Sequence, residues 1–476
     1  MYDSFGLYWN GKWQKPSSGK SIPVISPVTE EVLGEAPAAS EDDTRNAIES
    51  AVSGTRQWRK VQAWERSRML SRVADVMREH TDDMARWLIL ELGKPLDQSR
   101  VEVSMAIEQF EWYAEEAKRI YGHVLESRQP HGKVLIQHEP VGVVAAFTSW
   151  NFPVVLAARK IAPALAAGCS IILRPAEEAP GSAMAFVQCL HEAGIPAGVI
   201  NLINGVPDMV SPVLMNDPRV RKISLTGSVR VGKLLVQASA KTLKRTTMEL
   251  GGHAPVIVFA DADAEAIAEQ AALVKFKHCG QVCASPSRFF IHESQAEEFT
   301  NKFIEIARNF KLGNGLDSDV DIGPLATRKR LNEVEQMVAG TLESGARLRL
   351  GGKRPEGFAR GFFYEPTVFD QVPDHAPIMK EEPFGPLVPI TTFRKFDEMI
   401  ERANSLEYGL TSYVFTRSQR LAHDTADALE AGMVASTHSL WHRRKHRMAV
   451  SNKAVSDGKA ALKVFTIISM SNMSTW

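Results

Sequence analysis

The stretch from residue 141 to residue 173, VGVVAAFTSWNFPVVLAARKIAPALAAGCSIIL, decides the fold of this chain. Residues 141–148 and 170–173 are short apolar runs typical of buried strands, and residues 154–167 between them carry a helical pattern. A helix that connects two buried strands places them side by side and parallel. The stretch therefore predicts a strand–helix–strand unit within a parallel, doubly wound sheet.

The same alternation continues on both sides of this stretch. Further strands are predicted at residues 199–203 and 222–225, and a second α/β series begins near Ala254. In the second series we expect strands at residues 256–259 and 289–292 and helices at residues 295–310 and 329–344. Upstream, residues 42–80 and 82–121 carry apolar residues at helical spacing among charges, which predicts long amphipathic helices. The fold class is therefore α/β.

Length and composition narrow the class of protein. A chain of 476 residues predicts two domains or more, and 44% hydrophobic with 24% charged residues is ordinary globular composition. The longest apolar runs are far shorter than a membrane span, and the first residues lack the basic start and apolar core of a signal peptide. Four cysteines in so long a chain do not make a disulfide framework. We therefore expect a cytoplasmic protein without a membrane segment.

The formal net charge of zero hides an asymmetry between the two ends of the chain. Residues 438–476 contain seven Lys or Arg and one Asp, whereas residues 1–437 contain 49 basic and 55 acidic side chains. A basic segment on an acidic body is one pattern of a nucleic-acid-binding arm. We favour a shifted reading frame as the origin of this segment, so no nucleic-acid partner is expected.

Three residues have side chains suited to acyl chemistry. Cys283 ends a Gly-Gln-Val-Cys stretch, and a cysteine is a useful nucleophile where its surroundings lower the thiol pKa or supply a base. Glu249 begins a Glu-Leu-Gly-Gly stretch 34 positions upstream and is a base that can activate water. Asn151 carries an amide that can hold a developing oxyanion. Taken singly, each has an ordinary alternative role: a buried structural thiol, a solvated carboxylate and a loop cap.

Several motifs occur together along most of the chain, from near the N-terminus to about Val434. They are Tyr8-Trp9-Asn10-Gly11, Ser26-Pro27, Trp150-Asn151-Phe152-Pro153, Thr226-Gly227-Ser228, Glu249-Leu250-Gly251-Gly252-His253, Cys283 with Ser285-Pro286 and Arg288, and Glu382-Pro383-Phe384-Gly385-Pro386. In this order and at this spacing, they resemble the aldehyde dehydrogenase superfamily. Its members oxidise aldehydes to carboxylic acids with NAD or NADP, so the resemblance implies an enzyme.

The resemblance also implies a domain organisation. Residues 1–120 and 141–252 would form a Rossmann-like NAD(P)-binding domain, and residues 253–437 an α/β catalytic domain. Residues 121–140 would form a small bridging arm used in oligomerisation. The active site would lie between the first two domains. Members of the family are dimers or tetramers, so a homo-oligomer is expected.

Each of the three catalytic candidates receives a role from the resemblance. Cys283 would attack the aldehyde carbon, and the Asn151 amide with the Cys283 backbone N–H would hold the oxyanion. Loss of hydride to the nicotinamide would leave a thioester on Cys283. Glu249 would then activate the water that releases the acid. No metal site is expected.

NAD is the expected cofactor, with NADP as the second candidate. Glu177 follows the predicted strand 170–173, where relatives hold the adenosine ribose, and it would accept hydrogen bonds from the hydroxyls and repel a 2′-phosphate. Arg174 stands where the family usually has Lys, and this change could widen tolerance of NADP. The cofactor-binding residues carried over are Thr148, Trp150, Arg174, Ala176, Glu177, Gly227, Ser228, Gly232, Leu250, Glu382 and Phe384. Gly227 and Ser228 would present a helix start to the pyrophosphate, although their spacing is not the usual GxGxxG.

Two cations are candidates for binding the substrate. Relatives that oxidise semialdehydes of dicarboxylic acids hold the far carboxylate with cations near the positions of Arg159 and Lys277, and a guanidinium can form two hydrogen bonds to it. Ser285-Pro286 and Arg288 also resemble the succinate- and ketoglutarate-semialdehyde subgroup. Either cation is otherwise a surface or interdomain charge. We expect a small carboxylated aldehyde such as succinate semialdehyde.

Two other functions remain open. A coenzyme-A-acylating semialdehyde dehydrogenase would form the same thioester, but Glu249 favours its hydrolysis by water. The non-enzyme alternative is an inactive member of the family that binds dinucleotide or serves as a structural protein.

The cysteine loop departs from the family at one position. His278 stands where relatives usually have Asn, and Cys279 lies four residues before Cys283. A reversible disulfide between the two cysteines requires Cα atoms within roughly 7 Å. A buried inert thiol is the favoured role for Cys279.

The C-terminal segment does not match the family. Relatives continue after residues 430–434 with a glycine-rich segment and a final strand, whereas this chain has one glycine, Gly458, after position 437. Allowed codons for the residues from Met448 onward, read two nucleotides later, spell GGVKQSGFGREG, which is close to the sequence of relatives. We therefore infer a frameshifted tail over residues 438–476. We expect the tail from His438 onward to be poorly ordered, the last strand of the bridging sheet to be lost and assembly to be weakened.

Overall fold

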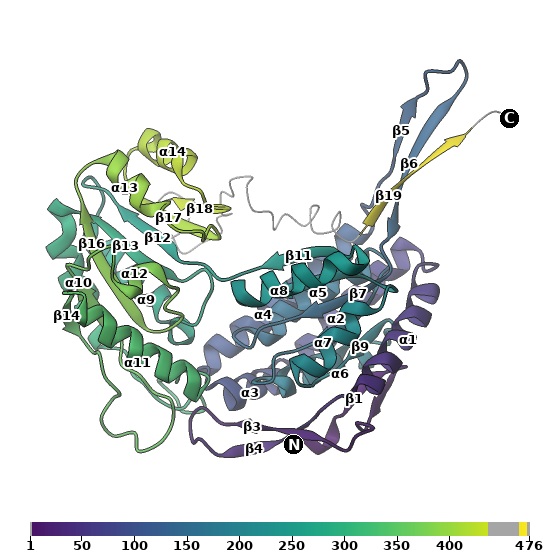
Figure 1. Ribbon diagram of the computed structural model, residues 1–476, viewed down its shortest axis with the longest axis horizontal. Helices are drawn as coiled ribbons and strands as arrows, with labels where there is room; N and C mark the ends of the chain where they lie inside the picture. The colour runs from purple at the N-terminus through teal and green to yellow at the C-terminus, as the bar shows by residue number, and fades with distance from the viewer. Residues whose placement is uncertain (1, 437–465, 474–476) are drawn as a thin grey trace.

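The computed structural model describes residues 2–436 and 466–473 (Figure 1). Two seven-stranded sheets, each covered by helices, form two α/β units that lie side by side. A three-stranded sheet projects away from them as an arm, and a two-stranded sheet runs along one side of the molecule. The α/β class predicted from the sequence is confirmed.

The first sheet has the order β11-β10-β7-β8-β9-β1-β2. Its strands are β1 Leu7–Trp9, β2 Lys12–Gln14, β7 Val143–Phe147, β8 Ser170–Arg174, β9 Ile200–Leu202, β10 Val220–Thr226 and β11 Arg245–Glu249. The five strands from β11 to β9 are parallel, as predicted, while β1 pairs antiparallel with β9 and β2 pairs antiparallel with β1. The sheet is therefore mixed rather than wholly parallel.

Strand β7 shows why this sheet lies between two layers of helices. Val143, Ala145 and Phe147 are buried on one face, and Val144 and Ala146 are buried on the other. Because successive side chains of a strand point to opposite faces, a strand that is apolar throughout must be covered on both sides. Helices α1, α7 and α8 cover one face, and α5 and α6 cover the other.

Three further helices, α2 to α4, pack outside α5 and α6. The helices of this unit are α1 Glu41–Trp58, α2 Ala63–Glu79, α3 Thr81–Leu92, α4 Leu96–Ala117, α5 Pro153–Ala166, α6 Pro180–Glu192, α7 Pro207–Asn216 and α8 Val229–Ser239. Local sequence signals fix where they start. Ser40 and Asp43 form a capping box at α1, and Pro153 occupies the first turn of α5, where its missing N–H costs no hydrogen bond.

The second sheet has the order β14-β15-β16-β13-β12-β17-β18. Its strands are β12 Ala254–Val258, β13 Pro286–His292, β14 Arg347–Leu350, β15 Thr367–Asp370, β16 Leu387–Phe393, β17 Thr411–Phe415 and β18 Met433–Ser436. Its helices are α9 Ala264–Lys275, α10 Ala296–Arg308, α11 Arg328–Glu343, α12 Pro377–Lys380, α13 Phe396–Ala403 and α14 Gln419–Ala428. Only β14 is antiparallel to its neighbour among the described strands of this sheet. The second predicted α/β series is thus present, with its own apolar core.

The hairpin of β3 Ser21–Ile25 and β4 Val32–Pro37 links the two units. The turn between its strands contacts the second unit, where Pro27 O accepts a hydrogen bond from Phe362 N at 2.9 Å. Glu30 in the same turn forms an ion pair with Arg328 at the start of α11. The N-terminal hairpin therefore bridges the sheets from outside.

The arm corrects one expectation about the tail. Strand β19 Thr466–Met473 pairs antiparallel with β6 Lys133–Pro140, which in turn pairs with β5 His123–Glu126. The final strand is therefore formed, in a register that runs from Thr466 opposite Pro140 to Met473 opposite Lys133. Ladder hydrogen bonds need only backbone groups, so strand pairing survives a change of side chains. Residues 437–465, on which the rest of the expectation depends, lie outside the described residues.

Four short 3-10 helices complete the described part: η1 Tyr2–Ser4, η2 Ala240–Thr242, η3 Lys277–Gly280 and η4 Glu293–Gln295. Among the described residues, no helix combines the length and apolar character needed to cross a bilayer.

Candidate active site

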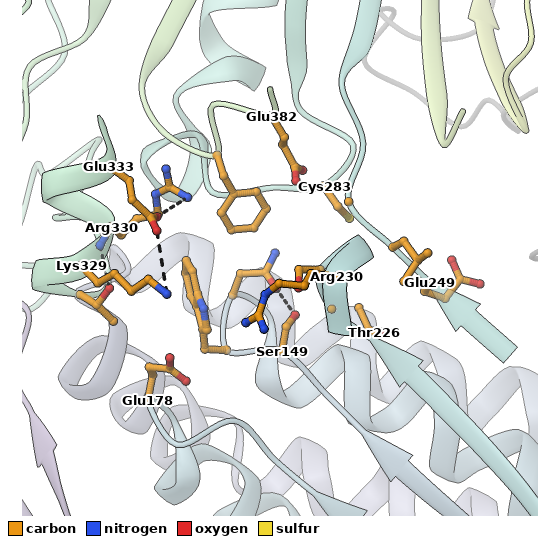
Figure 2. A pocket seen from close by; sticks show the side chains of 18 residues that line it. Ser149, Glu178, Thr226, Arg230, Glu249, Cys283, Lys329, Arg330, Glu333 and Glu382 are labelled. Atoms are coloured by element: carbon orange, nitrogen blue, oxygen red, sulfur yellow. Dashed lines mark hydrogen bonds and ion pairs between the residues drawn. The ribbon is translucent and has the colours of Figure 1, made fainter. Parts of the chain in front are cut away.

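A pocket of about 410 Å³ lies between the two α/β units (Figure 2). Both units contribute to its walls. The lining residues are Ser149, Trp150, Asn151, Glu178, Thr226, Gly227, Ser228, Arg230, Glu249, Leu250, Gly251, Cys283, Thr327, Lys329, Arg330, Glu333, Glu382 and Phe384. Cys283, Glu249 and Asn151, which the sequence proposes as the catalytic set, all line this one pocket.

The first unit contributes the carboxyl ends of three parallel strands. Residues 149–151 follow β7, residues 226–228 end β10 and begin α8, and Glu249 ends β11. Gly227 N donates a hydrogen bond to Glu249 O at 3.0 Å, which holds the last two segments together. Ligands of open α/β sheets bind at this edge, because loops and helix N-termini meet there.

The second unit contributes three loops. Cys283 lies between η3 and β13, Glu382 and Phe384 lie between α12 and β16, and Thr327 with Arg330 marks the start of α11. The Phe384 ring meets the Trp150 ring of the first unit edge to face, with centroids 5.5 Å apart. This aromatic contact joins the walls of the pocket.

The Cys283 thiol is half-buried and lies among opposing charges. Burial raises its pKa, and the Glu382 carboxylate raises it further. The Arg159 guanidinium and a hydrogen bond from the Ala284 backbone lower it, while Glu249 has a smaller raising effect. The protein alone therefore leaves this thiol less acidic than a free cysteine.

Asn151 is buried, and its amide is held from both sides. Ser149 Oγ donates to Asn151 Oδ1 at 2.6 Å, and Asn151 Nδ2 donates to Gln281 O at 3.0 Å. Gln281 belongs to the loop that leads to Cys283, so the amide directly connects the two catalytic segments. One of the two Nδ2 hydrogens is used in this way, and the other is available to an oxyanion.

Glu249 differs from the other two because its side chain is exposed. In Figure 2 its carboxylate points away from the Cys283 thiol. A base that acts on water in a later step needs access to solvent, and this position provides it.

Glu382 is the strongly perturbed acid of the pocket. Burial raises its pKa to about 7, although Gly252 N donates to its Oε1 at 3.1 Å. A Cβ on Gly251 would overlap the Glu382 carboxylate, so only glycine allows this approach. Glu382 and Phe384, two of the cofactor-binding candidates, thus line the same pocket as Cys283.

The start of α8 forms part of the pocket wall. Ser228 caps the helix by accepting a hydrogen bond from Val231 N at 3.3 Å, and Gly227 and Ser228 line the pocket. Gly232, by contrast, is outside the lining residues, and a Cβ there would lie 2.7 Å from a Leu250 methyl group. Its role in this structure is close packing of the helix against Leu250.

Thr148, Arg174, Ala176 and Glu177 lie outside the pocket lining, at the carboxyl ends of β7 and β8. Arg174 Nη2 donates to Gly205 O at 2.7 Å and lies 3.6 Å from the Glu177 carboxylate. Several buried polar atoms at this edge have no hydrogen-bond partner among the described residues. They are Thr148 Oγ1, Arg174 Nε, Asn204 Nδ2 and Asn204 Oδ1. Unpartnered polar groups beside the half-buried Glu177 carboxylate fit the hydroxyl-rich adenosine half of a dinucleotide.

The two substrate-binding candidates are not equally placed. Arg159 is exposed on α5 and lies close enough to Cys283 to influence its thiol. Lys277 is exposed in η3, and neither residue lines the pocket as described.

Cys279 is buried, and burial raises its pKa to about 12, which fits an inert thiol. The alternative role for Cys279, a reversible disulfide with Cys283, is absent here, where both are free cysteines.

Sequence reasoning missed the charged rim of the pocket. Glu178, Arg230, Lys329, Arg330 and Glu333 all line it. Arg230 could have been predicted from the sequence, because it lies in the first turn of the helix that follows Thr226-Gly227-Ser228. The α11 residues had none, since helix α11 reaches the pocket only through the packing of the second unit.

Comparisons with known proteins agree with this geometry. Residues 13–450 match the model of the aldehyde dehydrogenase family. The chain is 40% identical over 425 residues to the succinate-semialdehyde dehydrogenase [NADP(+)] GabD of Escherichia coli (strain K12), covering 89% of this chain and 88% of the relative. It is 40% identical over 427 residues to the glutarate-semialdehyde dehydrogenase of Pseudomonas putida, covering 90% and 88%.

Solved structures show the same likeness. The crystal structure of succinate-semialdehyde dehydrogenase from Burkholderia pseudomallei superposes with a TM-score of 0.94 at 37% identity, covering 99% of this chain and 98% of that one. The NAD+ complex of an aldehyde dehydrogenase from Bacillus cereus gives 0.93 at 31% identity, covering 99% and 97%. The chain belongs to the aldehyde dehydrogenase family. It is an NAD(P)-dependent enzyme that oxidises aldehydes.

Proposed function

We propose that this enzyme oxidises a small aldehyde that carries a second, anionic group, such as succinate semialdehyde, to the acid. Cys283 is the nucleophile, Asn151 the oxyanion donor and Glu249 the base for hydrolysis. The proposal is supported by the position of these three residues, which all line one pocket. The nucleophile and the oxyanion donor are joined through Gln281 by hydrogen bonding.

Cys283, Asn151 and Glu249 act in successive steps of the proposed reaction. The Cys283 thiolate forms a C–S bond to the aldehyde carbon, and the carbonyl oxygen gains the negative charge. The Asn151 amide N–H and the Cys283 backbone N–H stabilise that oxygen. A bound nicotinamide cofactor would supply the hydride acceptor, and loss of hydride from the former aldehyde carbon leaves a thioester on Cys283. Glu249 takes a proton from water, which attacks the thioester, and the thiolate leaves as the acid forms.

The proposal of an anionic substrate depends mainly on Arg159. Its guanidinium is exposed although helix α5 is otherwise buried, and its charge reaches Cys283. A cation beside the nucleophile can hold a carboxylate at the far end of a short substrate. The names of relatives point the same way, since they include succinate-, glutarate-semialdehyde and 3-sulfolactaldehyde dehydrogenases. Lys277 is the second, weaker candidate for the same anion.

Reduction of cofactor would be followed with succinate semialdehyde, glutarate semialdehyde, 3-sulfolactaldehyde and butanal, a neutral control. We expect higher kcat/KM for the anionic aldehydes. Arg159→Met should lower that preference by roughly 10- to 100-fold, because a hydrogen bond to a charged group contributes about 1.5–3 kcal/mol. Arg420→Met, an exposed cation on α14, is the matched control. An unchanged ratio of anionic to neutral substrates in Arg159→Met would exclude Arg159 as the anion site.

Two further experiments test the thioester mechanism and distinguish hydrolysis from transfer to coenzyme A. Cys283→Ala should abolish turnover, and activity at the parental rate would refute the thioester mechanism. Product analysis should give the free acid with and without coenzyme A, whereas an acyl-coenzyme A product would identify the acylating reaction.

The domain organisation belongs to the same proposal. Residues 1–120 and 141–252 would hold the cofactor, residues 253–437 would supply the nucleophile, and residues 121–140 would serve subunit assembly in a homo-oligomer. The support is the division of the pocket between the two sheets and the projection of β5 and β6 away from both.

A further inference from the structure

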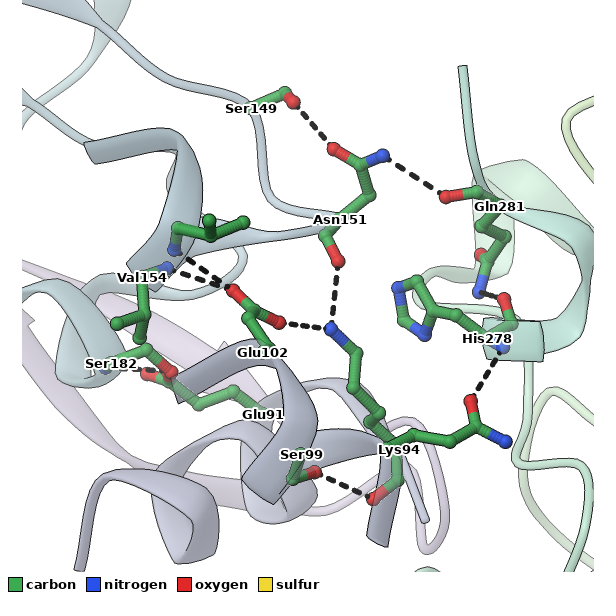
Figure 3. Close-up of polar contacts among 12 residues, drawn as sticks. Glu91, Lys94, Ser99, Glu102, Ser149, Asn151, Val154, Ser182, His278 and Gln281 are labelled. Atoms are coloured by element: carbon green, nitrogen blue, oxygen red, sulfur yellow. Dashed lines mark hydrogen bonds and ion pairs between the residues drawn. The ribbon is translucent and has the colours of Figure 1, made fainter. Parts of the chain in front are cut away.

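Lys94 is a fully buried lysine directly behind Asn151 (Figure 3). Its ammonium group donates a hydrogen bond to Asn151 O at 3.0 Å and forms an ion pair with Glu102. It also lies 4.1 Å from the centre of the Phe152 ring. Burying a charge is costly even when it is paired, so the position of this lysine is poorly explained by stability alone.

The turn that carries Lys94 is fixed by its neighbours. Helix α3 ends at Gly93, which has φ +65°, and a Cβ there would overlap the Pro324 ring of the second unit. Ser99 Oγ donates to Lys94 O at 3.2 Å, which ties the residue to the first turn of α4. Both backbone and side chain of Lys94 are therefore restrained.

Glu102 extends the restraint to the start of α5. Its Oε1 accepts hydrogen bonds from Val154 N at 3.0 Å and Val155 N at 3.3 Å, two amides that a helix leaves without intrahelical partners. The Lys94–Glu102 ion pair therefore holds both ends of the segment from Asn151 to Val155. Phe152 lies between these anchors and covers the ammonium.

The direction of the Asn151 amide follows from these contacts. Its backbone oxygen is held by Lys94, its Oδ1 by Ser149, and one Nδ2 hydrogen by the Gln281 carbonyl. With the plane of the amide fixed, the second Nδ2 hydrogen has a single direction. Oxyanion donors are effective only when their direction is set before the reaction.

We propose that Lys94, paired with Glu102, is a positioning residue that aims the Asn151 amide at the oxyanion. The proposal rests on the proposed role of Asn151 as the oxyanion donor. Lys94 touches no reacting atom; it acts through the Asn151 backbone. Removing it should therefore slow steps that form an oxyanion and spare steps that do not.

Two reactions of Cys283 separate these steps. Attack on p-nitrophenyl acetate forms a C–S bond, places negative charge on the carbonyl oxygen and then expels p-nitrophenolate. Alkylation by iodoacetamide also forms a C–S bond but expels iodide, and no oxyanion develops. Both reactions need the thiolate, and neither needs the cofactor.

The test compares Lys94→Met, Asn151→Ala, the double variant and Lys244→Met in both reactions. Lys244 is the matched control, a buried lysine whose Nζ donates to Asp217 O and Val220 O far from the pocket. Asn151→Ala should slow the ester reaction by about 10²- to 10³-fold. Lys94→Met should slow it by about 10- to 100-fold, the range that a misplaced catalytic group costs. Alkylation should change less than threefold in every variant.

The two changes should also be non-additive. In the Asn151→Ala background, Lys94→Met should have little further effect on the ester reaction, since it acts through the missing amide. If Lys94→Met does not yield folded protein, Lys94→Met/Glu102→Gln removes both charges, keeps an acceptor for the α5 amides and carries the same comparison.

Each failure has its own signature. If Asn151→Ala leaves the ester reaction intact, the proposed oxyanion donor is wrong. If Asn151→Ala slows it but Lys94→Met matches Lys244→Met, the positioning role is wrong. Equal slowing of ester hydrolysis and alkylation by Lys94→Met would show a general structural effect and would also overturn the proposal.

Discussion

At the scale of single residues, two charges of opposite sign shift the pKa of the Cys283 thiol, the proposed nucleophile. Glu382 raises the pKa of the Cys283 thiol and Arg159 lowers it, on top of the increase caused by burial. The thiolate fraction at neutral pH therefore depends on which of these charges is present. Replacing either side chain should therefore change the fraction of Cys283 that is present as the reactive thiolate.

Alkylation of Cys283 by iodoacetamide, measured from pH 6 to 10, should follow these controls. Removing the negative charge in Glu382→Gln favours the thiolate, so the midpoint of the rate profile should move to lower pH. Removing the positive charge in Arg159→Met should move it to higher pH. Shifts in the same direction for both variants would contradict the assignment of charges around the thiol.

We also expect individual side chains to determine the choice between NAD and NADP. Glu177 follows β8 and faces Arg174 at 3.6 Å, so part of its negative charge is balanced inside the protein. The acid should still repel a 2′-phosphate, but less than an unpaired glutamate would. This predicts an enzyme that prefers NAD with a narrow margin.

We expect a higher kcat/KM with NAD than with NADP. Glu177→Gln should shift the ratio towards NADP by about tenfold, equivalent to about 1.4 kcal/mol. The measurement is a comparison of initial rates at limiting cofactor, with the binding of each cofactor followed separately by tryptophan fluorescence. A parental preference for NADP would show that Glu177 does not control the choice.

At the scale of elements, the sequence predicted the parts whose pattern is local. Residues 141–148 and 170–173 correspond to β7 and β8, and residues 154–167 to α5, each within a few positions. The short strands β1 and β2 were missed because a three-residue strand has no period to recognise. Lys94 was missed for a different reason: nothing local distinguishes a buried lysine from an exposed one. The three proposed catalytic residues were singled out because each motif is local, while Arg330 and Glu333 reach the pocket only through tertiary packing.

The cysteine loop is the most constrained element of the site. His278, Cys279 and Gly280 all have positive φ, at 48°, 54° and 72°, and His278 N donates to Gln98 Oε1 at 2.8 Å. Consecutive left-handed residues are unfavourable for side chains other than glycine. The loop is therefore held in shape by its surroundings.

Gly280→Ala should disturb this loop strongly. An added Cβ would be strained at this φ and would overlap the Gly385 carbonyl oxygen. Gly345→Ala is the matched control, because Gly345 has φ +93° with nothing within 4 Å of an added Cβ. We expect Gly280→Ala to lower the free energy of unfolding in urea by about 1–3 kcal/mol more than the control, with loss of activity. Equal effects would mean that backbone strain alone matters at Gly280.

At the scale of the whole molecule, we expect the C-terminal segment to influence assembly. Strand β19 supplies the backbone pairing of a final strand, but the glycines that precede this strand in relatives are missing from the sequence. The basic run before β19 resists burial. We expect the chain as given to be less stable and less oligomeric than a chain with the glycine-rich ending.

Resequencing the coding DNA around the codon for Ala435 tests the shifted frame directly. A version with the frame restored should elute as a dimer or tetramer in size-exclusion chromatography with light scattering, and should be more active than the chain as given. A stable, active oligomer formed by the present sequence would refute this prediction.

The division of the pocket between two sheets has a thermodynamic consequence. No single unit contains the site, so a dinucleotide or aldehyde bound there gains its full contacts only when both units are folded and docked. Binding energy is then linked to docking, and the bound molecule acts as a clamp across the cleft. Ligand-free protein can lose the contact between units before either unit unfolds, whereas saturated protein must give up its ligand first. We therefore expect bound substrate and cofactor to stabilise the contact between the two units of this enzyme.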